Sequence, residues 1–269
     1  MIGVYDSGIG GLSILGALRA ELPEQDFIYL ADSGHGPYGE RELDHVIERA
    51  QRVTADLVER GVEALVVACN TATAAAIERL RGQYPQLPII GVEPALKPAL
   101  GRSQTRRIGV MATRMTLASD KFLRLLESVQ DQAKFVLQPC DGLALAIENS
   151  VHDSAAAQAA LVACASGHVR ALGPLGAALG QIDTVVLGCT HYPFIAPMLQ
   201  QWVGPGVTLV EPGAAVARQT RSRLAEKSRP MTPGSGHIEL ISTGAIDGLQ
   251  AAAQRWLQPE LLAQSVHLP

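Results

Sequence analysis

Seven short runs of apolar, mostly β-branched residues recur along the chain, separated by segments with helical periodicity. They cover residues 2–5, 27–31, 64–68, 88–92, 107–111, 184–188 and 207–211. None alternates between apolar and polar residues as a sheet with one solvated face does, so each run predicts a strand buried on both sides. Such strands occur in sheets covered by helices on both faces. The sequence therefore predicts an α/β fold with mainly parallel sheets.

Helical patterns fill the spaces between these runs. Leucines recur at helical spacing over residues 12–22, and an apolar stripe over residues 43–57 ends at Gly61. Two further segments, 116–129 and the alanine-rich 154–172, also predict helices. Strand and helix thus alternate along the chain, as they do in parallel α/β folds.

Composition narrows the functional classes. The chain has 269 residues, of which 47% are hydrophobic and 18% charged, so it can bury a large core. A net charge of −4, without long blocks of like charge, argues against a nucleic acid or a membrane surface as partner. No apolar run is as long as a membrane span, and "MIGVYDSG" does not resemble a signal peptide. Four cysteines in a chain of this length do not predict a disulfide framework, so we expect a reduced, cytoplasmic protein.

The sequence contains an internal repeat. "IGVYDSGIGGLS" at residues 2–13 aligns with "IGVMATRMTLAS" at residues 108–119. "ALVVACNTATA", which contains Cys69, has the same form as "TVVLGCTHYP", which contains Cys189. In each case a strand pattern ends in a cysteine, and a polar stretch and a helical pattern follow. The duplication predicts two similar α/β lobes.

Polar and thiol side chains follow the predicted strands. They are Asp6, Ser7, Asp32, Cys69, Thr113 and Cys189. In open α/β sheets, ligands bind beyond the carboxyl ends of the strands. If the two lobes face each other, both thiols meet in one cleft.

Three alternative chemistries deserve comparison. Gly8, Gly10 and Ser13, with Asp32 after the next strand, partly match a dinucleotide-binding pattern, but Asp6 would place a carboxylate near the pyrophosphate. A zinc site formed by both cysteines and His191 lacks the short ligand spacings that are typical of such sites. A nucleophilic Cys189 paired with His191 leaves Cys69 without a role. Cys140 and Cys164 are interpreted as small buried apolar residues.

Proton transfer at a stereocentre uses both cysteines. Inversion needs one group that removes a proton and a second group that delivers a proton to the opposite face. A thiol at a helix N-terminus is favoured as thiolate by the helix dipole and the free N–H groups. Two lobes that each offer one thiol meet this requirement.

Six motifs, in order, resemble the cofactor-independent aspartate/glutamate racemase family: "DSGIGGLS", "ADSGHGPYG", "ACNTATA", "GVEPALKPA", "ATRMTLAS" and "LGCTHYP". The resemblance is strongest over residues 1–195 and continues through "LVEPGAAVA" and the C-terminal segment. It implies two pseudo-symmetric α/β domains with the active site in the cleft between them. The first domain would comprise residues 1–94 and 208–269, and the second residues 95–207.

The resemblance also implies an activity. It is interconversion of L- and D-glutamate, which supplies D-glutamate for peptidoglycan, without cofactor or metal, in a cytoplasmic homodimer. Neither nucleic acid nor membrane would be a partner. The alternatives are a racemase for aspartate or another acidic amino acid, and a binding protein that uses the same two lobes without turnover.

Site residues follow from the same resemblance. Cys69 and Cys189 match the catalytic thiols, Asp6 and His191 match the polar groups beside them, and Glu148, downstream of Cys140, is the candidate for a third catalytic helper. The implied substrate contacts are Asp6, Ser7, Asp32, Ser33, Pro37, Tyr38, Gly39, Asn70, Thr71, Thr113, Thr116, Thr190 and His191.

Overall fold

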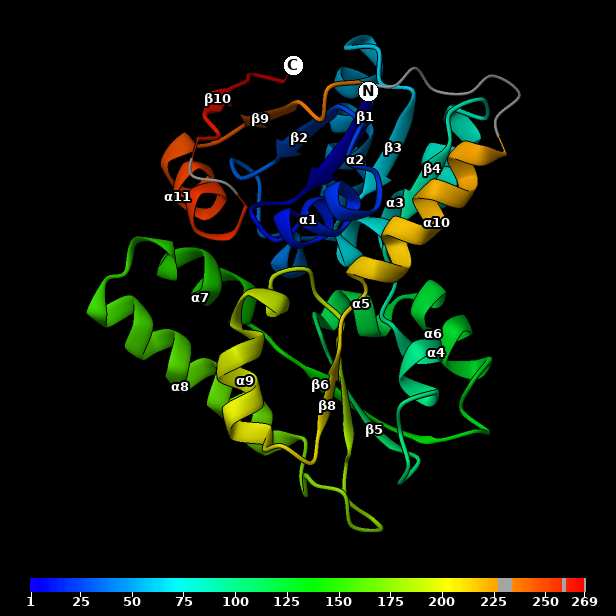
Figure 1. Ribbon diagram of the computed structural model, residues 1–269, viewed down its shortest axis with the longest axis vertical. Coiled ribbons are helices and arrows are strands. Elements are labelled where there is room, and N and C mark those ends of the chain that lie inside the picture. Colours follow the sequence, from blue (N-terminus) through cyan, green and yellow to red (C-terminus); the bar gives the residue numbers. More distant parts are fainter. Residues whose placement is uncertain (227–233, 258–259, 269) are drawn as a thin grey trace. The chain divides into compact units, whose positions relative to one another are not determined.

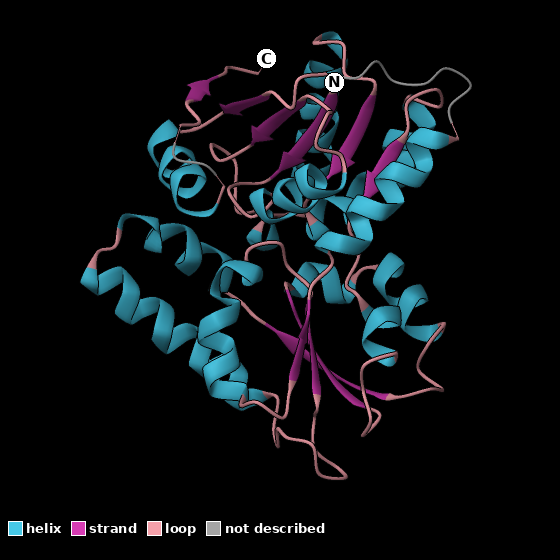
Figure 2. Ribbon diagram, in the orientation of Figure 1, coloured by secondary structure: helices cyan, strands magenta, loops and turns pink. Residues whose placement is uncertain are grey.

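The computed structural model describes residues 1–226, 234–257 and 260–268. The chain forms two compact units, one of residues 1–92 and 213–269 and the other of residues 93–212. Each unit contains one sheet with helices packed on it (Figures 1 and 2). All strand pairs in both sheets are parallel, as the continuous apolar runs predict.

The first unit has a six-stranded sheet with the order β10-β9-β2-β1-β3-β4. Its strands are β1 (Ile2–Asp6), β2 (Phe27–Ala31), β3 (Ala64–Val67), β4 (Ile89–Gly91), β9 (Ile238–Ser242) and β10 (Ala263–Ser265). The four predicted N-terminal strands are confirmed. The segment "GSGHIEL" (residues 234–240), whose position the sequence leaves open, leads into β9, which pairs with β2 and so completes this sheet from the C-terminal part of the chain.

Five long helices cover this sheet. On one face, α1 (Leu12–Glu21) contacts both α10 (Gly213–Ala225) and α11 (Ile246–Trp256), and on the other α2 (Leu43–Glu59) pairs with α3 (Asn70–Gln83) (Figure 1). The chain runs from β1 through α1 to β2 in one direction, and from β3 through α3 to β4 in the other. The winding direction therefore reverses between β1 and β3.

The second unit repeats this plan on a smaller scale. Its sheet has the order β6-β5-β7-β8, formed by β5 (Arg107–Ala112), β6 (Lys134–Pro139), β7 (Thr184–Leu187) and β8 (Thr208–Val210). The winding reverses between β5 and β7. These strands correspond in order to β1 and β3 of the first unit, and the predicted duplication is therefore visible in the topology.

Two apolar clusters enclose the second sheet. One contains side chains of α7 (Leu143–Asn149), α8 (Ala155–Ala171) and α9 (Ala196–Val203). The other contains side chains of α4 (Leu96–Leu100), α5 (Arg114–Ala118) and α6 (Asp120–Glu127). A core on each face explains why β5 and β7 carry uninterrupted apolar runs.

Three expectations need correction. The second unit extends over residues 93–212, so residues 93–94 and 208–212 do not belong to the first domain, and β8 pairs with β7 in the second sheet. The predicted helix over 116–129 is two helices, because Ser119 ends α5 and caps α6: its hydroxyl accepts a hydrogen bond from the Phe122 N–H at 3.2 Å. The edge strand β6 was not predicted, because it is half-exposed and its apolar run covers only residues 135–137, between polar residues.

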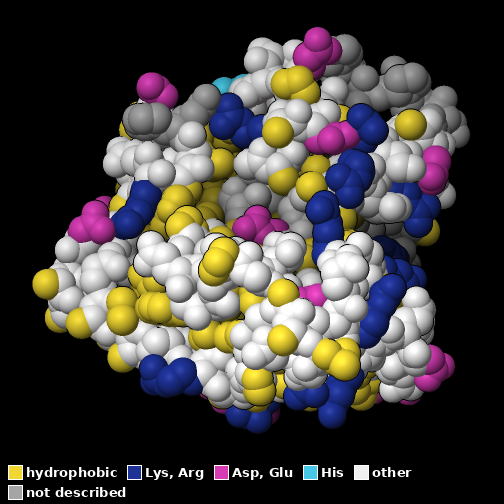
Figure 3. Space-filling view, turned by 60° about the horizontal axis from the view of Figure 1, so that its bottom comes forward, with side chains coloured by type: hydrophobic (Ala, Val, Ile, Leu, Met, Phe, Trp, Pro, Cys, Tyr) yellow, Lys and Arg dark blue, Asp and Glu magenta, His cyan; other side chains and the backbone are white. Residues whose placement is uncertain are grey.

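The surface is chemically mixed. The face in Figure 3 carries both basic and acidic side chains, separated by wide neutral areas. None of the described helices combines the length and the apolar composition needed to cross a membrane.

Gly11→Ala tests the packing at the end of β1. A Cβ atom at this position would lie 2.7 Å from the Asp6 Cβ and 3.0 Å from the Tyr29 ring. We expect the free energy of unfolding, measured with urea, to fall by about 1–3 kcal/mol through overpacking. Gly82→Ala is the control: nothing lies within 4 Å of its Cβ position in α3. This variant should be as stable as the wild type or more stable. Wild-type stability of Gly11→Ala would contradict the close packing.

Candidate active site

Cys69 lies where β3 ends and α3 begins. It is the N-cap of α3, a helix of 14 residues, and its Sγ accepts a hydrogen bond from the Ala72 N–H at 3.4 Å. Its side chain is buried, with 6% exposed. The unpaired N–H groups and the dipole at a helix start favour negative charge on this sulfur. The fold therefore gives Cys69 the setting that the sequence predicts.

Polar groups surround Cys69 at the neighbouring strand end. Ser7 Oγ lies 3.8 Å from Cys69 Sγ, and the buried Asp6 carboxylate accepts a hydrogen bond from the Gly8 N–H at 3.1 Å. Asn70 is buried, and neither atom of its amide has a hydrogen-bond partner among the described residues. A buried amide without partners is costly in a folded protein. Asn70 therefore marks a place where a polar ligand would complete the structure.

Asp32, at the end of β2, is occupied by protein donors. Its buried carboxylate accepts hydrogen bonds from Arg49 Nε (3.0 Å) and Nη2 (2.9 Å), Tyr38 Oη (2.5 Å), Thr243 Oγ1 (2.8 Å) and His35 Nδ1 (3.1 Å). Burial alone would raise the pKa of Asp32, but the hydrogen bonds from Arg49, Tyr38 and Thr243 outweigh it and hold the pKa below its usual value. The carboxylate is thus a charged anchor inside the first unit.

Three partners of this anchor, Arg49, His35 and Thr243, were not identified from the sequence. Arg49 lies on α2 between Val46 and Val53, on the buried face of the helix. An arginine inside an otherwise apolar stripe was the available signal, since such a charge is buried only when it is paired. Thr243 follows β9, more than 200 residues from Asp32, and no local pattern points to it.

Cys189 follows β7 in the second unit, at the place that corresponds to Cys69. It is also buried, with 6% exposed. Its helical start differs from the prediction, because a short 3₁₀ segment (Tyr192–Ile195) precedes α9. Instead of capping an α-helix, the Cys189 sulfur lies 3.7 Å from Nδ1 of His191. At Cys189 an imidazole therefore lies next to the sulfur, whereas at Cys69 the neighbouring group is a helix N-terminus.

His191 links Cys189 to Glu148. Its Nε2 lies 2.8 Å from Glu148 Oε1, and its side chain is 3% exposed. Burial lowers the pKa of His191, but the interactions with Cys189 and Glu148 outweigh it and raise the pKa well above 6.5. The structure thus brings Cys189, His191 and Glu148, all selected from the sequence, into one chain of contacts between the loop that follows β7 and helix α7.

The remaining selected residues occupy the same strand ends. Thr113 caps α5, and its hydroxyl contacts Thr116 Oγ1 at 2.9 Å. Thr71, two residues after Cys69, and Thr190, directly after Cys189, are both buried. Ser33 and the turn that carries Pro37 and Gly39 follow β2. Cys140 is nearly fully buried, as expected, and burial raises the pKa of its thiol well above the usual range. The same expectation for Cys164 is wrong, because its thiol on α8 is only partly buried.

The geometry weakens the dinucleotide-binding alternative. The Gly8 N–H, which a bound pyrophosphate would need, is used by the Asp6 carboxylate, and Asp32 has no lone pair to spare for a ribose. Within the described residues, no three Cys, His, Asp or Glu side chains are grouped so that they could hold a metal ion.

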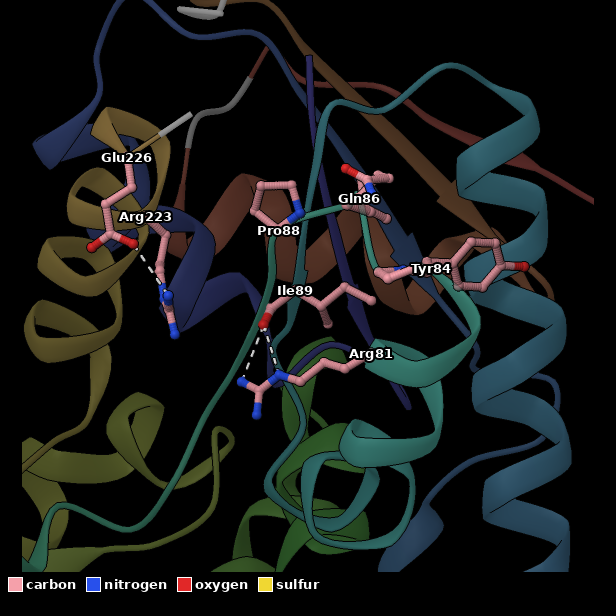
Figure 4. Close-up of a pocket in the computed structure, with 9 residues that line it drawn as sticks. Arg81, Tyr84, Gln86, Pro88, Ile89, Arg223 and Glu226 are labelled. Carbon is pink, nitrogen blue, oxygen red and sulfur yellow. Dashed lines mark hydrogen bonds and ion pairs between the residues drawn. The ribbon is translucent and has the colours of Figure 1, made fainter. Parts of the chain in front are cut away.

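A hollow of about 380 Å³ lies elsewhere in the first unit (Figure 4). Pro88 and Ile89 line it, so it lies at the amino end of β4, whereas Cys69 follows the carboxyl end of β3. Its arginines are already paired: Arg81 donates to the Ile89 carbonyl, and Arg223 donates to Glu226. The hollow is not part of the candidate active site.

The chain is similar to known proteins along most of its length. Residues 13–220 match the family model described as Asp/Glu/Hydantoin racemase. The chain is 43% identical to a glutamate racemase of Ectopseudomonas mendocina (93% of this chain, 92% of the relative) and 43% identical to one of Ralstonia nicotianae (99% and 93%).

Solved structures give the same result. Glutamate racemase isoform RacE1 from Bacillus anthracis has a TM-score of 0.85 at 28% identity, with 100% of this chain and 98% of that chain covered. The Escherichia coli glutamate racemase, solved in complex with L-glutamate and the activator UDP-MurNAc-ala, has the same TM-score, identity and coverage.

Glu148→Gln tests the contact with His191. The amide keeps hydrogen-bonding capacity but removes the negative charge, so we expect the pKa of His191 to fall toward 6.5, as measured by proton NMR of the imidazole. The pKa of His191 is raised by folding, so its stabilising contribution is present below about pH 6.5 and is lost as pH rises through the folded-state pKa. The stability difference between wild type and variant should shrink in the same direction.

Asp141→Asn is the control for this experiment. Asp141 pairs with the exposed Arg114, so its loss should leave the titration of His191 unchanged. A His191 midpoint that is the same in wild type and Glu148→Gln would contradict the contact.

Proposed function

This chain belongs to the Asp/Glu/Hydantoin racemase family, and we propose that it interconverts L-glutamate and D-glutamate by moving a proton at the α-carbon. Its relatives named as glutamate racemases match it along nearly the whole chain, which supports glutamate as the substrate. Aspartate is the alternative substrate that the family description leaves open.

The observation that carries the proposal is the equivalent placement of two thiols. Cys69 follows β3, and Cys189 follows β7. Each of these strands is one of the two between which the winding of its sheet reverses. Ligands of open α/β sheets bind at this position. A binding protein has no need of two such thiols, whereas inversion of a stereocentre needs two groups that exchange protons.

The proposed reaction balances with these two residues alone. One cysteine, as thiolate, removes the α-proton of glutamate and becomes a thiol, and the electron pair remains on the α-carbon. The other cysteine, as thiol, delivers its proton to the opposite face and becomes a thiolate. The reaction of the opposite enantiomer starts with the roles of the two cysteines exchanged. Because the two thiols carry both protons, the proposed reaction uses no cofactor or metal.

Each thiol has its own means of holding negative charge. For Cys69 we propose the α3 N-terminus, with Asp6 as the neighbouring acid/base group. For Cys189 we propose His191, because the interactions of the imidazole with Cys189 itself and with Glu148 outweigh burial and raise the pKa of His191. Nδ1 of His191 lies 3.7 Å from the Cys189 sulfur.

Substrate binding is assigned to the polar groups around the thiols. The unpartnered Asn70 amide and the N–H groups at the α3 start suit the carboxylate groups of an amino acid. The other proposed contacts are Asp6, Ser7, Ser33, Pro37, Tyr38, Gly39, Thr71, Thr113, Thr116, Thr190 and His191.

The cellular role follows from the product. We propose that the D-glutamate enters peptidoglycan, and that a homodimer carries out the reaction in the cytoplasm. Reduced thiols are essential to this chemistry, and that compartment maintains them.

Chiral chromatography of glutamate incubated with purified enzyme tests the function. Wild type should convert either enantiomer to a racemic mixture and act much more slowly on aspartate. Cys69→Ala and Cys189→Ala should each lower racemisation at least about 10³-fold, since inversion needs both proton carriers. Cys164→Ala is the control: its partly exposed thiol lies in α8, outside the proposed site, and activity should be retained. Near wild-type racemisation by either alanine variant at positions 69 or 189 would refute the mechanism.

A further inference from the structure

We propose that Arg49 and Asp32 are positioning residues that hold the substrate-binding turn around Tyr38, and that Asp32 does not itself bind substrate. This inference rests on the proposed function, because its effect is read out as glutamate racemisation. It replaces the expectation, drawn from the family resemblance, that Asp32 contacts the substrate.

The coordination of Asp32 is complete without a ligand. Oδ1 accepts hydrogen bonds from Arg49, Thr243 and His35, and Oδ2 accepts from Arg49 and Tyr38. These five donors meet about four lone-pair sites on a carboxylate. A substrate ammonium group would have to displace one of them from a side chain with 0% exposed.

Arg49 determines the geometry of this cluster. Its guanidinium binds both oxygens of Asp32, at 3.0 and 2.9 Å, from the buried face of α2. A bidentate pair fixes direction as well as distance, which a lysine cannot do. With Thr243, the pair joins α2, the end of β2 and the end of β9.

Tyr38 transmits this geometry to the site. Its hydroxyl donates to Asp32 Oδ2 at 2.5 Å, and its side chain is fully buried in the short 3₁₀ helix η1 (Tyr38–Glu40). Burial, with smaller contributions from Asp32 and Cys69, raises the pKa of Tyr38 well above 10, so it remains a donor. This 3₁₀ helix contacts α3, whose first turn Cys69 caps. A shift of Asp32 therefore moves the turn against the helix of the catalytic thiol.

The second unit offers a matched control. Asp183 is also buried and accepts hydrogen bonds from the Ser103 hydroxyl at 2.6 Å and from two backbone N–H groups. It precedes β7, so it lies at the opposite end of that strand from Cys189. Loss of a hydroxyl donor there perturbs a buried carboxylate without touching the proposed site.

The experiment compares four variants for melting temperature and for the KM and kcat of glutamate racemisation. Arg49→Lys keeps the charge but loses the bidentate geometry, and Thr243→Val removes one hydroxyl donor from Asp32. Thr243→Ser restores that hydroxyl, and Ser103→Ala is the matched control. We expect a KM increase of roughly fivefold to tenfold for Thr243→Val, and at least as much for Arg49→Lys, with a smaller change in kcat. Thr243→Ser and Ser103→Ala should keep the wild-type KM.

The outcomes separate the two proposals. If wild type and Ser103→Ala do not racemise glutamate, the proposed function fails. If they do, and Thr243→Val loses only melting temperature to the same extent as Ser103→Ala with an unchanged KM, the cluster is merely structural and the positioning role is refuted. Thr243→Val decides the matter even if Arg49→Lys does not fold.

Discussion

The reversal of winding in each parallel sheet is the constraint on which the rest of this structure depends. In the first unit the chain leaves β1 and β3 in opposite directions, and in the second unit it leaves β5 and β7 in opposite directions. The loops after these strands therefore diverge, and side chains at the strand ends remain available to a ligand. Cys69 and Cys189 lie at these two places. The chemistry assigned to the protein is thus a consequence of topology, used twice.

The two thiols are similarly buried, but different groups lie next to them. Cys69 is the N-cap of a 14-residue α-helix, and its sulfur accepts a hydrogen bond from the Ala72 N–H. Cys189 precedes a short 3₁₀ segment and contacts His191, which Glu148 supports from α7. Cys69 therefore lies at the fixed dipole of a helix, whereas Cys189 lies next to a side chain that can titrate. On this account pH acts mainly on the Cys189 side of the reaction, through the Glu148–His191 pair.

Much of this could be predicted from the sequence, and the failures have physical causes. Strands such as β1 and β3 are buried on both faces, so their apolar runs identify them without tertiary information. β6 was missed because an edge strand carries a weaker pattern, and the boundary at residue 208 was misplaced because pairing between β7 and β8 is non-local. Cys69, Cys189 and His191 stand in recognisable motifs. The Arg49–Asp32–Thr243 cluster does not, because residues more than 200 positions apart meet only in the folded chain.

The central claim is that two cysteines serve opposite faces of one α-carbon, and isotope exchange tests it most directly. Racemisation of unlabelled L-glutamate in D2O, followed by mass spectrometry of the separated enantiomers, reports which proton each face receives. Thiol protons exchange readily with solvent. The account therefore predicts one deuterium at the α-carbon of D-glutamate from the first turnovers, while the remaining L-glutamate stays almost unlabelled. Early labelling of both enantiomers, or substantial retention of protium in the product, would indicate a single base and would contradict the account.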